Sequence, residues 1–299
     1  MLEHCTLCPR LCGANRNAGE HGFCGADARI RIGLASLHQW EEPCLSGTNG
    51  AGTVFFCHCP LGCVYCQNHD ISGLDADASG ICTDISGLAD TFLSLQQRGA
   101  HNIDLVTPTQ YAAQLTQAIP LARRRGLIIP IVYNCGGYER VETLRELEGL
   151  VDIYLPDMKY ADPKLAGILS AAPDYVEITK EAIAEMYRQV GSAVIEDEIM
   201  QRGMIVRHLM LPGELDNTLG VLDWFSEAFP KGDVLFSLMS QYVPMGKAKT
   251  MPPYDRRITE DEYDAALSYL ELLGIENGFT QDFSAATEEY IPDFSFEGL

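Results

Sequence analysis

The chain has 299 residues, with 42 Asp and Glu against 21 Lys and Arg, which gives a formal net charge of −21. Proteins that bind nucleic acid concentrate Lys and Arg to hold phosphates, so this balance argues against a nucleic-acid partner. The hydrophobic content of 46% is that of an ordinary globular protein, and the length allows two average domains or one large α/β domain.

The sequence has neither a run of about 18 apolar residues nor a basic start followed by an apolar stretch, so we expect no membrane span and no secretory signal. The expected location is therefore the cytoplasm. In a reducing compartment, clustered cysteines are metal ligands more often than disulfides. The chain has 11 cysteines, most of them in two clusters, which predicts two metal sites.

Residues 1–50 are rich in Cys and Gly and lack a long helical period, which indicates a small metal-stapled extension with strand-like alternation at 29–32. Four cysteines with the spacing Cys-x2-Cys-x3-Cys-x11-Cys lie in it: Cys5, Cys8, Cys12 and Cys24. Four thiolates make a closed site, so zinc and a second [4Fe-4S] cluster both fit. So short a glycine-rich segment has little other reason to fold, which argues against four unrelated thiols.

Short apolar runs alternate with helical periods from residue 53 onward. The expected strands are 53–57, 103–107, 127–133, 151–155, 204–211 and 234–238, and the expected helices are 85–97, 111–125, 141–150, 175–190, 219–229 and 260–273. Apolar strands that each precede a helix indicate a parallel sheet covered by helices. Six units are too few for a closed eight-unit barrel, so we expect an α/β partial (β/α)6 barrel over 51–280, followed by an acidic C-terminal tail at 281–299.

Polar side chains recur at the ends of the expected strands: Thr107, Thr109, Asn134, Asp157, Lys159, Arg207 and Gln241. The carboxyl ends of parallel strands meet at one edge, which is where the active sites of such barrels lie. Asp157 or Thr109 could merely cap the next helix, and Asp157 with Lys159 could be an ordinary ion pair. So many polar residues in register nevertheless favour a site at this edge.

Three cysteines follow the first expected strand at the spacing Cys-x3-Cys-x2-Cys: Cys59, Cys63 and Cys66. Three thiolates within eight residues can hold three corners of a [4Fe-4S] cluster, leaving one iron open to a substrate or cofactor. One alternative is a zinc knuckle with His58 or Cys57 as the fourth ligand, and another is a redox dithiol at Cys63 and Cys66. The compact spacing at the mouth of the expected barrel favours the iron–sulfur cluster.

This spacing, with the aromatic Tyr65 before Cys66, resembles the signature of the radical S-adenosylmethionine (SAM) enzymes. Further stretches resemble the PflX-like branch of that superfamily, which is related to the pyruvate formate-lyase activating enzymes. They are Cys5-x2-Cys8-Pro9-Arg10-x-Cys12-Gly13, Cys66-Gln67-Asn68, Val-Thr-Pro-Thr at 106–109, Tyr-Asn at 133–134, Tyr-Leu-Pro-Asp-Met-Lys-Tyr at 154–160 and Ser-Gln-Tyr at 240–242. The resemblance covers nearly the whole chain.

The resemblance implies that Cys59, Cys63 and Cys66 hold a [4Fe-4S] cluster whose open iron chelates SAM. It also implies an external one-electron donor of the flavodoxin or ferredoxin type. Reductive cleavage of SAM would then give a 5′-deoxyadenosyl radical that abstracts hydrogen from a substrate. Tyr65 would lie near the adenine.

The same resemblance assigns SAM contacts at the strand ends. Thr107 and Thr109 stand where most of the superfamily has a Gly-Gly-Glu motif for the SAM amino group, a departure of this chain. Asn134 is similar in position to residues that contact the SAM carboxylate or ribose.

Three charged residues complete the implied SAM site. Asp157 and Lys159 resemble an Asp-x-Lys element in which the Asp helps to hold a monovalent cation and the Lys points to the methionine end. Arg207 matches a SAM-contacting Arg, and its planar guanidinium suits a carboxylate.

We expect an oxidoreductase that resembles the glycyl-radical-activating enzymes, with a glycyl radical enzyme or a peptide as substrate. Radical modification of a small metabolite is one alternative, and a non-catalytic zinc-binding adaptor is another. The segment with His38, Glu41 and Glu42 either faces the substrate cavity or packs in a hairpin. Four cysteines have no assigned role: Cys44, Cys57, Cys82 and Cys135.

Overall fold

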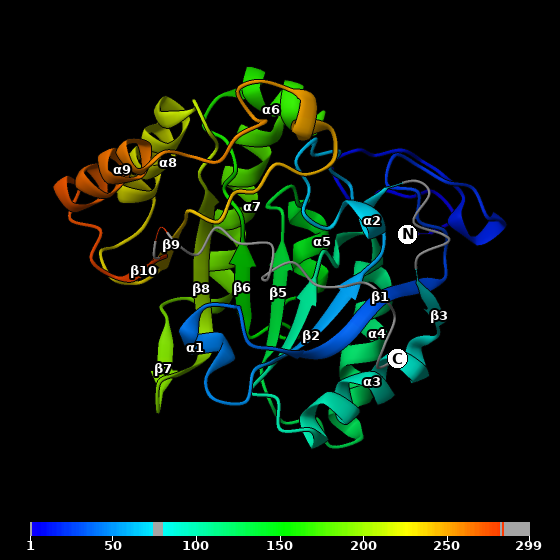
Figure 1. Cartoon of the computed structure of the whole chain (residues 1–299). Coiled ribbons are helices and arrows are strands. Elements are labelled where there is room, and N and C mark those ends of the chain that lie inside the picture. Colours follow the sequence, from blue (N-terminus) through cyan, green and yellow to red (C-terminus); the bar gives the residue numbers. More distant parts are fainter. Residues whose placement is uncertain (1, 74–79, 282, 284–299) are drawn as a thin grey trace.

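The computed structural model describes residues 2–73, 80–281 and 283, so the acidic tail expected at 281–299 falls almost wholly outside the described residues. Ten strands form one sheet, in the order β10-β9-β8-β6-β5-β4-β2-β1-β3, with β7 paired to β8 (Figure 1). The strands are β1 (Ile30–His38), β2 (Ala51–Phe56), β3 (Ile81–Thr83), β4 (Ile103–Val106), β5 (Ile131–Cys135), β6 (Ile153–Pro156), β7 (Val194–Glu196), β8 (Ile199–Leu209), β9 (Leu235–Met239) and β10 (Gly278–Thr280).

The α-helices of the described residues lie mostly between parallel strands. They are α1 (Pro43–Ser46), α2 (His69–Ser72), α3 (Ile85–Gln97), α4 (Ala112–Arg124), α5 (Val141–Glu146), α6 (Pro163–Ser170), α7 (Tyr175–Val190), α8 (Leu215–Ala228) and α9 (Glu260–Leu272). None of them is long and apolar enough to cross a membrane.

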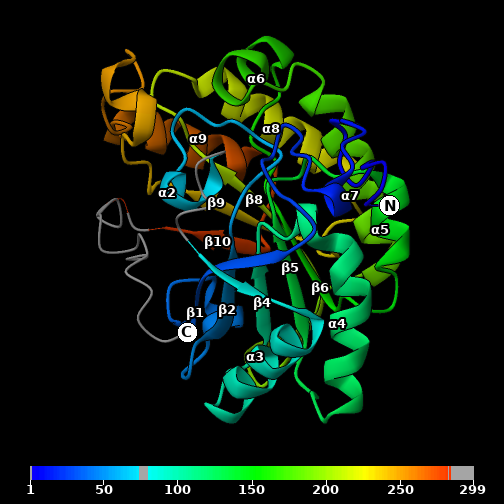
Figure 2. The same ribbon diagram turned by 90° about the vertical axis from the view of Figure 1, so that its right-hand side faces the viewer.

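The central strands run parallel from β2 through β4, β5, β6, β8 and β9 to β10, while β1 and β3 add antiparallel strands at one edge. Within the described chain β10 and β3 end the sheet and do not pair with each other, so the barrel stays open. Helices α3, α4, α5 and α7 lie along one side of the sheet and α1 along the other (Figure 1 and Figure 2). The expected α/β partial barrel is confirmed.

The side chains of each strand point alternately to the two faces of the sheet, so the two faces have different residues. Tyr133 and Tyr154 belong to the large core beneath the helices, whereas Val132 and Ile205 belong to a smaller core that also includes Leu45 of α1. Because successive side chains of a strand point to opposite faces, Asp104, Asn134 and Arg207 share the face of this smaller core. The second face of the sheet therefore combines an apolar floor with polar groups near the carboxyl ends of the strands.

Every expected strand and helix has a counterpart, and α3 and α7 have the bounds expected from the sequence. The strand expected at 127–133 begins instead at Ile131. Pro130 has no N–H for a ladder, and the backbone N–H groups of Ile128 and Ile129 donate to the side chain of Gln96. Helix α6 and strands β3, β7 and β10 were not expected.

Candidate functional site

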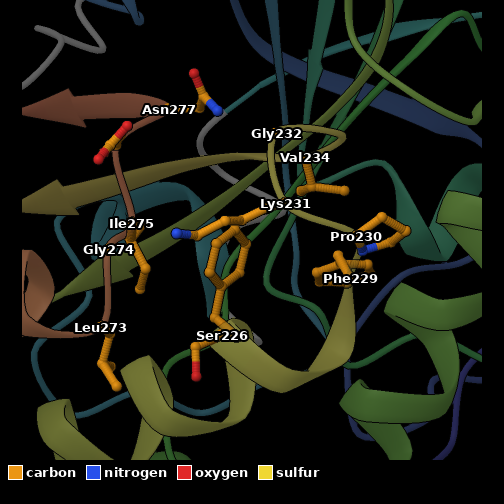
Figure 3. A pocket seen from close by; sticks show the side chains of 12 residues that line it. Ser226, Phe229, Pro230, Lys231, Gly232, Val234, Leu273, Gly274, Ile275 and Asn277 are labelled. Carbon is orange, nitrogen blue, oxygen red and sulfur yellow. The ribbon is translucent and has the colours of Figure 1, made fainter.

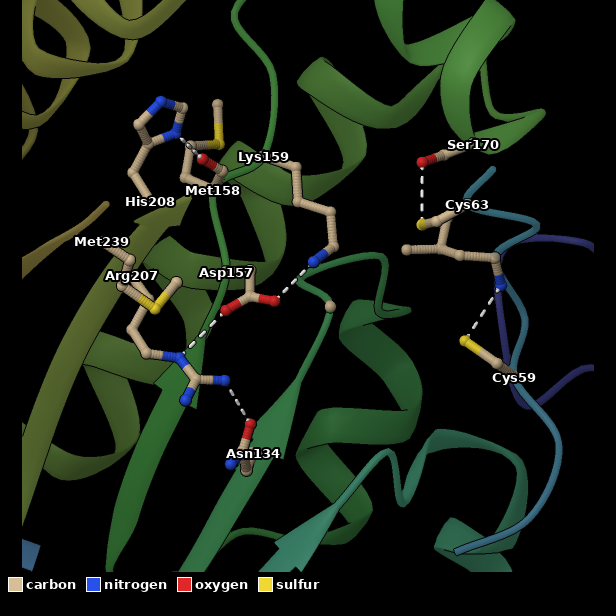
Figure 4. Close-up of polar contacts among 12 residues, drawn as sticks. Cys59, Cys63, Asn134, Asp157, Met158, Lys159, Ser170, Arg207, His208 and Met239 are labelled. Atoms are coloured by element: carbon tan, nitrogen blue, oxygen red, sulfur yellow. Dashed lines mark hydrogen bonds and ion pairs between the residues drawn. The ribbon is translucent and has the colours of Figure 1, made fainter. Parts of the chain in front are cut away.

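The loop that follows β2 carries Cys59, Cys63 and Cys66. The amide of Leu61 donates to Cys59 Sγ over 3.4 Å, and the amide of Cys66 donates to the carbonyl of Cys63 over 3.3 Å. Cys63 contacts Ser170 of α6, and Lys159 extends toward the side of the site where the loop lies (Figure 4). The loop therefore places its cysteines at the carboxyl end of the sheet, opposite the predicted SAM contacts.

Burial is the main cause that raises the pKa of each of these three thiols, that of Cys63 to about 11, and neighbouring cysteines contribute to the shifts of Cys59 and Cys63. The ammonium of Lys159 lowers the pKa of all three. Three soft sulfur donors near one cation suit an iron–sulfur cluster. In the described part of the chain, at this loop and in the N-terminal extension alike, no three His, Cys, Asp or Glu side chains already surround one metal position. Cys63 Sγ lies 2.9 Å from Ser170 Oγ.

A chain of hydroxyl groups supports this loop from behind. The Tyr65 hydroxyl lies 2.7 Å from that of Tyr160, which lies 2.6 Å from Ser170 Oγ. Ser170 Oγ in turn contacts Cys63 Sγ. Tyr65 is buried, with its ring 6.0 Å from that of Tyr242. The structure thus gives Tyr65 a role in packing the loop, and its contact with the SAM adenine stays a prediction.

A network of charged groups joins four of the predicted residues (Figure 4). Asp157 Oδ2 accepts from Lys159 Nζ at 2.5 Å, and Oδ1 accepts from Arg207 Nε at 3.0 Å. Arg207 Nη2 donates to Asn134 Oδ1 at 2.5 Å. Burial would raise the pKa of Asp157, but Lys159 and Arg207 outweigh it and hold that pKa below its usual range. Both oxygens of Asp157 already face cations, and the expected monovalent cation beside it stays a prediction.

Two further carboxylates belong to this network. Glu41 Oε2 accepts from Arg207 Nη1 at 3.1 Å, and Asp104 Oδ2 accepts from Asn134 Nδ2 at 3.4 Å. Asp104 was not among the predicted residues, although a lone carboxylate in an otherwise apolar strand is a signal in the sequence. For Glu41 the sequence left two roles open, and the structure places it on the charge network.

The segment after β4 carries Thr107 in a strained conformation with φ of 56°, which β-branched residues rarely adopt. Its amide donates to the carbonyl of Asn134 at 2.8 Å. One buried amide, Gln110 Nε2, contacts the carbonyls of Cys57, His58 and Thr107 at 2.8 to 2.9 Å. Sequence reasoning missed Gln110, which ties the cysteine loop to the Thr107 segment.

Thr109 has a different environment from Thr107. Its hydroxyl donates to Glu139 Oε1 at 2.5 Å, and the Tyr133 hydroxyl donates to Oε2 at 3.2 Å. Burial raises the pKa of Glu139 to about 7, although these hydrogen bonds oppose the shift. Thr109 is thus held away from the charge network, and its predicted contact with SAM remains a prediction.

The N-terminal extension brings its four cysteines near one another. Cys5, Cys8 and Cys24 are buried, and Cys12 is exposed. Burial raises the pKa of Cys8 to about 12 and also raises that of Cys24, and each is raised further by neighbouring cysteines of this set. A Cβ on Gly22 would clash with Cys12 Sγ, so a larger residue at this position would force the Cys12 side chain to move.

Arg10, inside this cysteine segment, joins the extension to the cluster loop. Its guanidinium donates to the carbonyl of Pro60 at 2.9 Å and to that of Ala171 at 2.6 Å. The same group lies 3.8 Å from the centre of the Phe23 ring. The two cysteine groups therefore lie on adjoining parts of the molecule.

Two cavities differ greatly in size. One, of about 580 Å³, opens beside Arg207 between the segment after β1 and the ends of β9 and β10. The other, of about 40 Å³, lies between the end of α8 and the segment before β10, where Phe229, Lys231 and Asn277 line it (Figure 3). A third cavity, of about 310 Å³, lies beside Glu139 and Arg140. The cavity beside Arg207 is the largest of these three and has the volume of a site for a small organic ligand.

The uncharacterized protein MJ0674 of Methanocaldococcus jannaschii is 30% identical to this chain over 285 residues, covering 92% of this chain and 77% of that protein. No family model matches the chain. The methylornithine synthase PylB is 13% identical with a TM-score of 0.50, over 74% of this chain and 68% of that one. SuiB of Streptococcus suis is also 13% identical with a TM-score of 0.50, over 80% of this chain and 50% of that one. The shared fold is the partial barrel of radical SAM enzymes.

Proposed function

The chain belongs to the same family as MJ0674, and we propose that it is a radical SAM enzyme that reductively cleaves SAM and abstracts hydrogen from a substrate. One observation carries this proposal: the Cys-x3-Cys-x2-Cys loop lies at the carboxyl end of an open parallel barrel, beside Lys159 and the charge network of Asp157 and Arg207.

Cys59, Cys63 and Cys66 would hold the [4Fe-4S] cluster, which supplies the electron that cleaves SAM to methionine and a 5′-deoxyadenosyl radical. The residues of the chain provide binding and orientation. Lys159 places a positive charge near the three thiols and so favours their thiolate form. The guanidinium of Arg207 has several N–H donors in one plane and is oriented by its hydrogen bond to Asp157, so it suits the carboxylate of SAM.

For the substrate we propose a glycyl radical enzyme or a peptide. The sheet does not close among the described residues, and an open barrel gives a peptide loop a route to the strand ends. A flavodoxin or ferredoxin would supply the electron. Modification of a small metabolite uses the same chemistry, and the appearance of a glycyl radical signal in a partner enzyme would separate the two.

We also propose that the N-terminal cysteines hold a second metal, either a [4Fe-4S] cluster or zinc. The support is their mutual proximity and the close approach of Gly22 to Cys12. Replacement of all three cysteines of the cluster loop by Ala should leave this metal in place. Loss of all metal from that variant would show that the two sites are not independent.

The direct test is formation of 5′-deoxyadenosine by the anaerobically reconstituted protein with SAM and dithionite. Cys63→Ala should reduce this product to background. Cys82→Ala is the matched control, because Cys82 is an exposed thiol in β3. A wild-type protein that binds iron and sulfide but gives no 5′-deoxyadenosine would refute the proposal. Zinc as the sole metal after anaerobic purification would favour the adaptor instead.

A further inference from the structure

The cavity beside Arg207 has a lining unlike that of the cluster loop. Glu41, Glu42 and Trp40 contribute from the segment after β1, and Ser237 contributes from β9. Its volume of about 580 Å³ falls within the range of sites for small organic ligands. Arg207 belongs both to this lining and to the charge network, so the cavity adjoins the proposed SAM site.

Acidic groups outnumber basic ones on this side of the sheet. In the described chain Arg207 is the one Lys or Arg side chain that lines the cavity. Four carboxylates act on it: those of Asp157, Glu42, Glu41 and Asp104. Asp157 is already paired with Lys159. A single guanidinium is therefore left to balance the other three acids.

Burial raises the pKa of Glu41, Glu42 and Asp104, although Arg207 opposes the shift in each case. The charge of Glu41 raises the pKa of Asp104 further. A hydrogen bond between the two carboxyls also raises the pKa of Asp104, while it lowers that of Glu41. Buried acids of this kind are stabilised either by protons or by a cation.

One buried carboxylate oxygen beside the cavity also lacks a partner. Glu42 is 8% exposed and lines the cavity, yet its Oε2 has no hydrogen-bond partner in the described part of the chain. A buried acceptor without a donor is costly, so such groups are rare in folded proteins unless water or a ligand supplies the donor.

We propose that this cavity binds a cationic group of the substrate, an ammonium or guanidinium, through Glu41 and Glu42, with Asp104 behind them. The inference rests on the proposed function, because it names the substrate class of the same site. The indole of Trp40, which also lines the cavity and is 57% exposed, offers an aromatic face to the same cation. The cation comes from a free amine or from a Lys or Arg side chain of a peptide.

Calorimetric titration of the reconstituted full-length protein tests this inference without requiring turnover. The probes are Nα-acetyl-lysine methylamide for a peptide side chain, 1,5-diaminopentane for a free amine, and Nα-acetyl-norleucine methylamide as the neutral analogue. At least one cationic probe should bind roughly tenfold or more tightly than the neutral one, since a hydrogen bond to a charged group contributes about 1.5–3 kcal/mol. The tighter cationic probe identifies the source.

Glu42→Gln should weaken binding of that probe roughly tenfold or more, because the amide keeps the shape but loses the charge. Glu41→Gln is a second variant in case the first does not fold. Glu196→Gln, at an exposed position of β7, is the matched control and should bind like the wild type.

Equal affinity for the cationic and neutral probes, or unchanged affinity in both cavity variants, overturns the inference. Cleavage of SAM is measured separately on the same preparation. Cleavage without preference for cations would refute only the inference, whereas cation binding without cleavage would refute only the radical SAM function.

Discussion

Replacement of Arg207 by Met removes the cation that holds the charge network together. The guanidinium contacts Asp157 at 3.0 Å and Glu41 at 3.1 Å, and its side chain is only 14% exposed. Asp157 keeps Lys159 as a partner after the substitution. Glu41 is left with Asp104, a second acid, so the substitution creates a buried carboxylate without a counter-charge.

Breaking a buried ion pair from one side costs about 3–5 kcal/mol, and we expect a loss of this size in the free energy of unfolding near pH 8. Because most of the loss comes from the uncompensated acid, Glu41→Gln should recover about 1–2 kcal/mol in the Arg207→Met background. Residues in direct contact show non-additive energies of this order.

The loss should also depend on pH. Burial already raises the pKa of Glu41 in the folded state, and removal of Arg207 raises it further. The folded variant then binds more protons than the unfolded chain at pH values above the unfolded pKa of about 4.3, so its stability falls as the pH rises. The destabilisation by Arg207→Met should therefore be smaller near pH 6 than near pH 8.

Urea unfolding under anaerobic reducing conditions, followed by tryptophan fluorescence, measures these differences. The reasoning fails if Arg207→Met costs less than about 1 kcal/mol, a value typical of an exposed pair. It also fails if the loss is the same at both pH values, or if the Glu41→Gln and Arg207→Met effects simply add.

Three further predictions concern the framework of the site. Gln110→Glu should destabilise the fold by about 1–3 kcal/mol in urea unfolding, because the amide that contacts three carbonyls is replaced by an acceptor. Gln117→Glu, on the exposed side of α4, is the control and should have little effect. Gly22→Ala should lower the metal content of the N-terminal extension but not that of the cluster loop, because the added methyl displaces Cys12; unchanged iron and zinc counts would contradict this. The pKa of Glu139 is raised to about 7 in the folded state, so this group alone should lower stability by about 3 kcal/mol as the pH rises from about 4.5 through 7. Glu139→Gln should reduce the fall in unfolding free energy by about this amount and leave the part that comes from Glu41, Glu42 and Asp104.

The local hydrophobic pattern of the sequence predicted many of the helices and strands. Helices α3 and α7 have the expected bounds because their apolar residues follow the helical period, and Asp84 caps the first turn of α3. The start of β5 was misplaced because apolar residues before Pro130 look like strand, although their amides bond to a side chain from α3. Helix α6 was missed even though Asp162 and Pro163 form a recognisable start. Pairing partners such as those of β1 and β10 depend on contacts that a periodic pattern does not contain.

The residues of the site likewise fall into those that the sequence could predict and those that depend on tertiary packing. Asn134, Asp157 and Arg207 could be found because strand order alone brings the ends of parallel strands to one edge. Glu41 comes from a segment far from these strands in the sequence, and its bond to Arg207 depends on how α1 packs against the sheet. The sequence shows Asp104 as a charged residue within an apolar strand, which could have marked it as a site residue. It does not show which residues Asp104 contacts.

The charge of −21 has two components with different consequences. Exposed acids stay hydrated and lower the stability of the fold little. Glu41, Glu42 and Asp104 are buried instead, and burial raises the pKa of each of them. If these acids only neutralised Arg207, one carboxylate besides Asp157 would be enough, because Asp157 is also paired with Lys159. The additional buried acids lower the stability of the fold, and such a cost is typical of functional sites. The excess of acid at this cavity is therefore better explained by a cationic ligand than by the packing of the sheet.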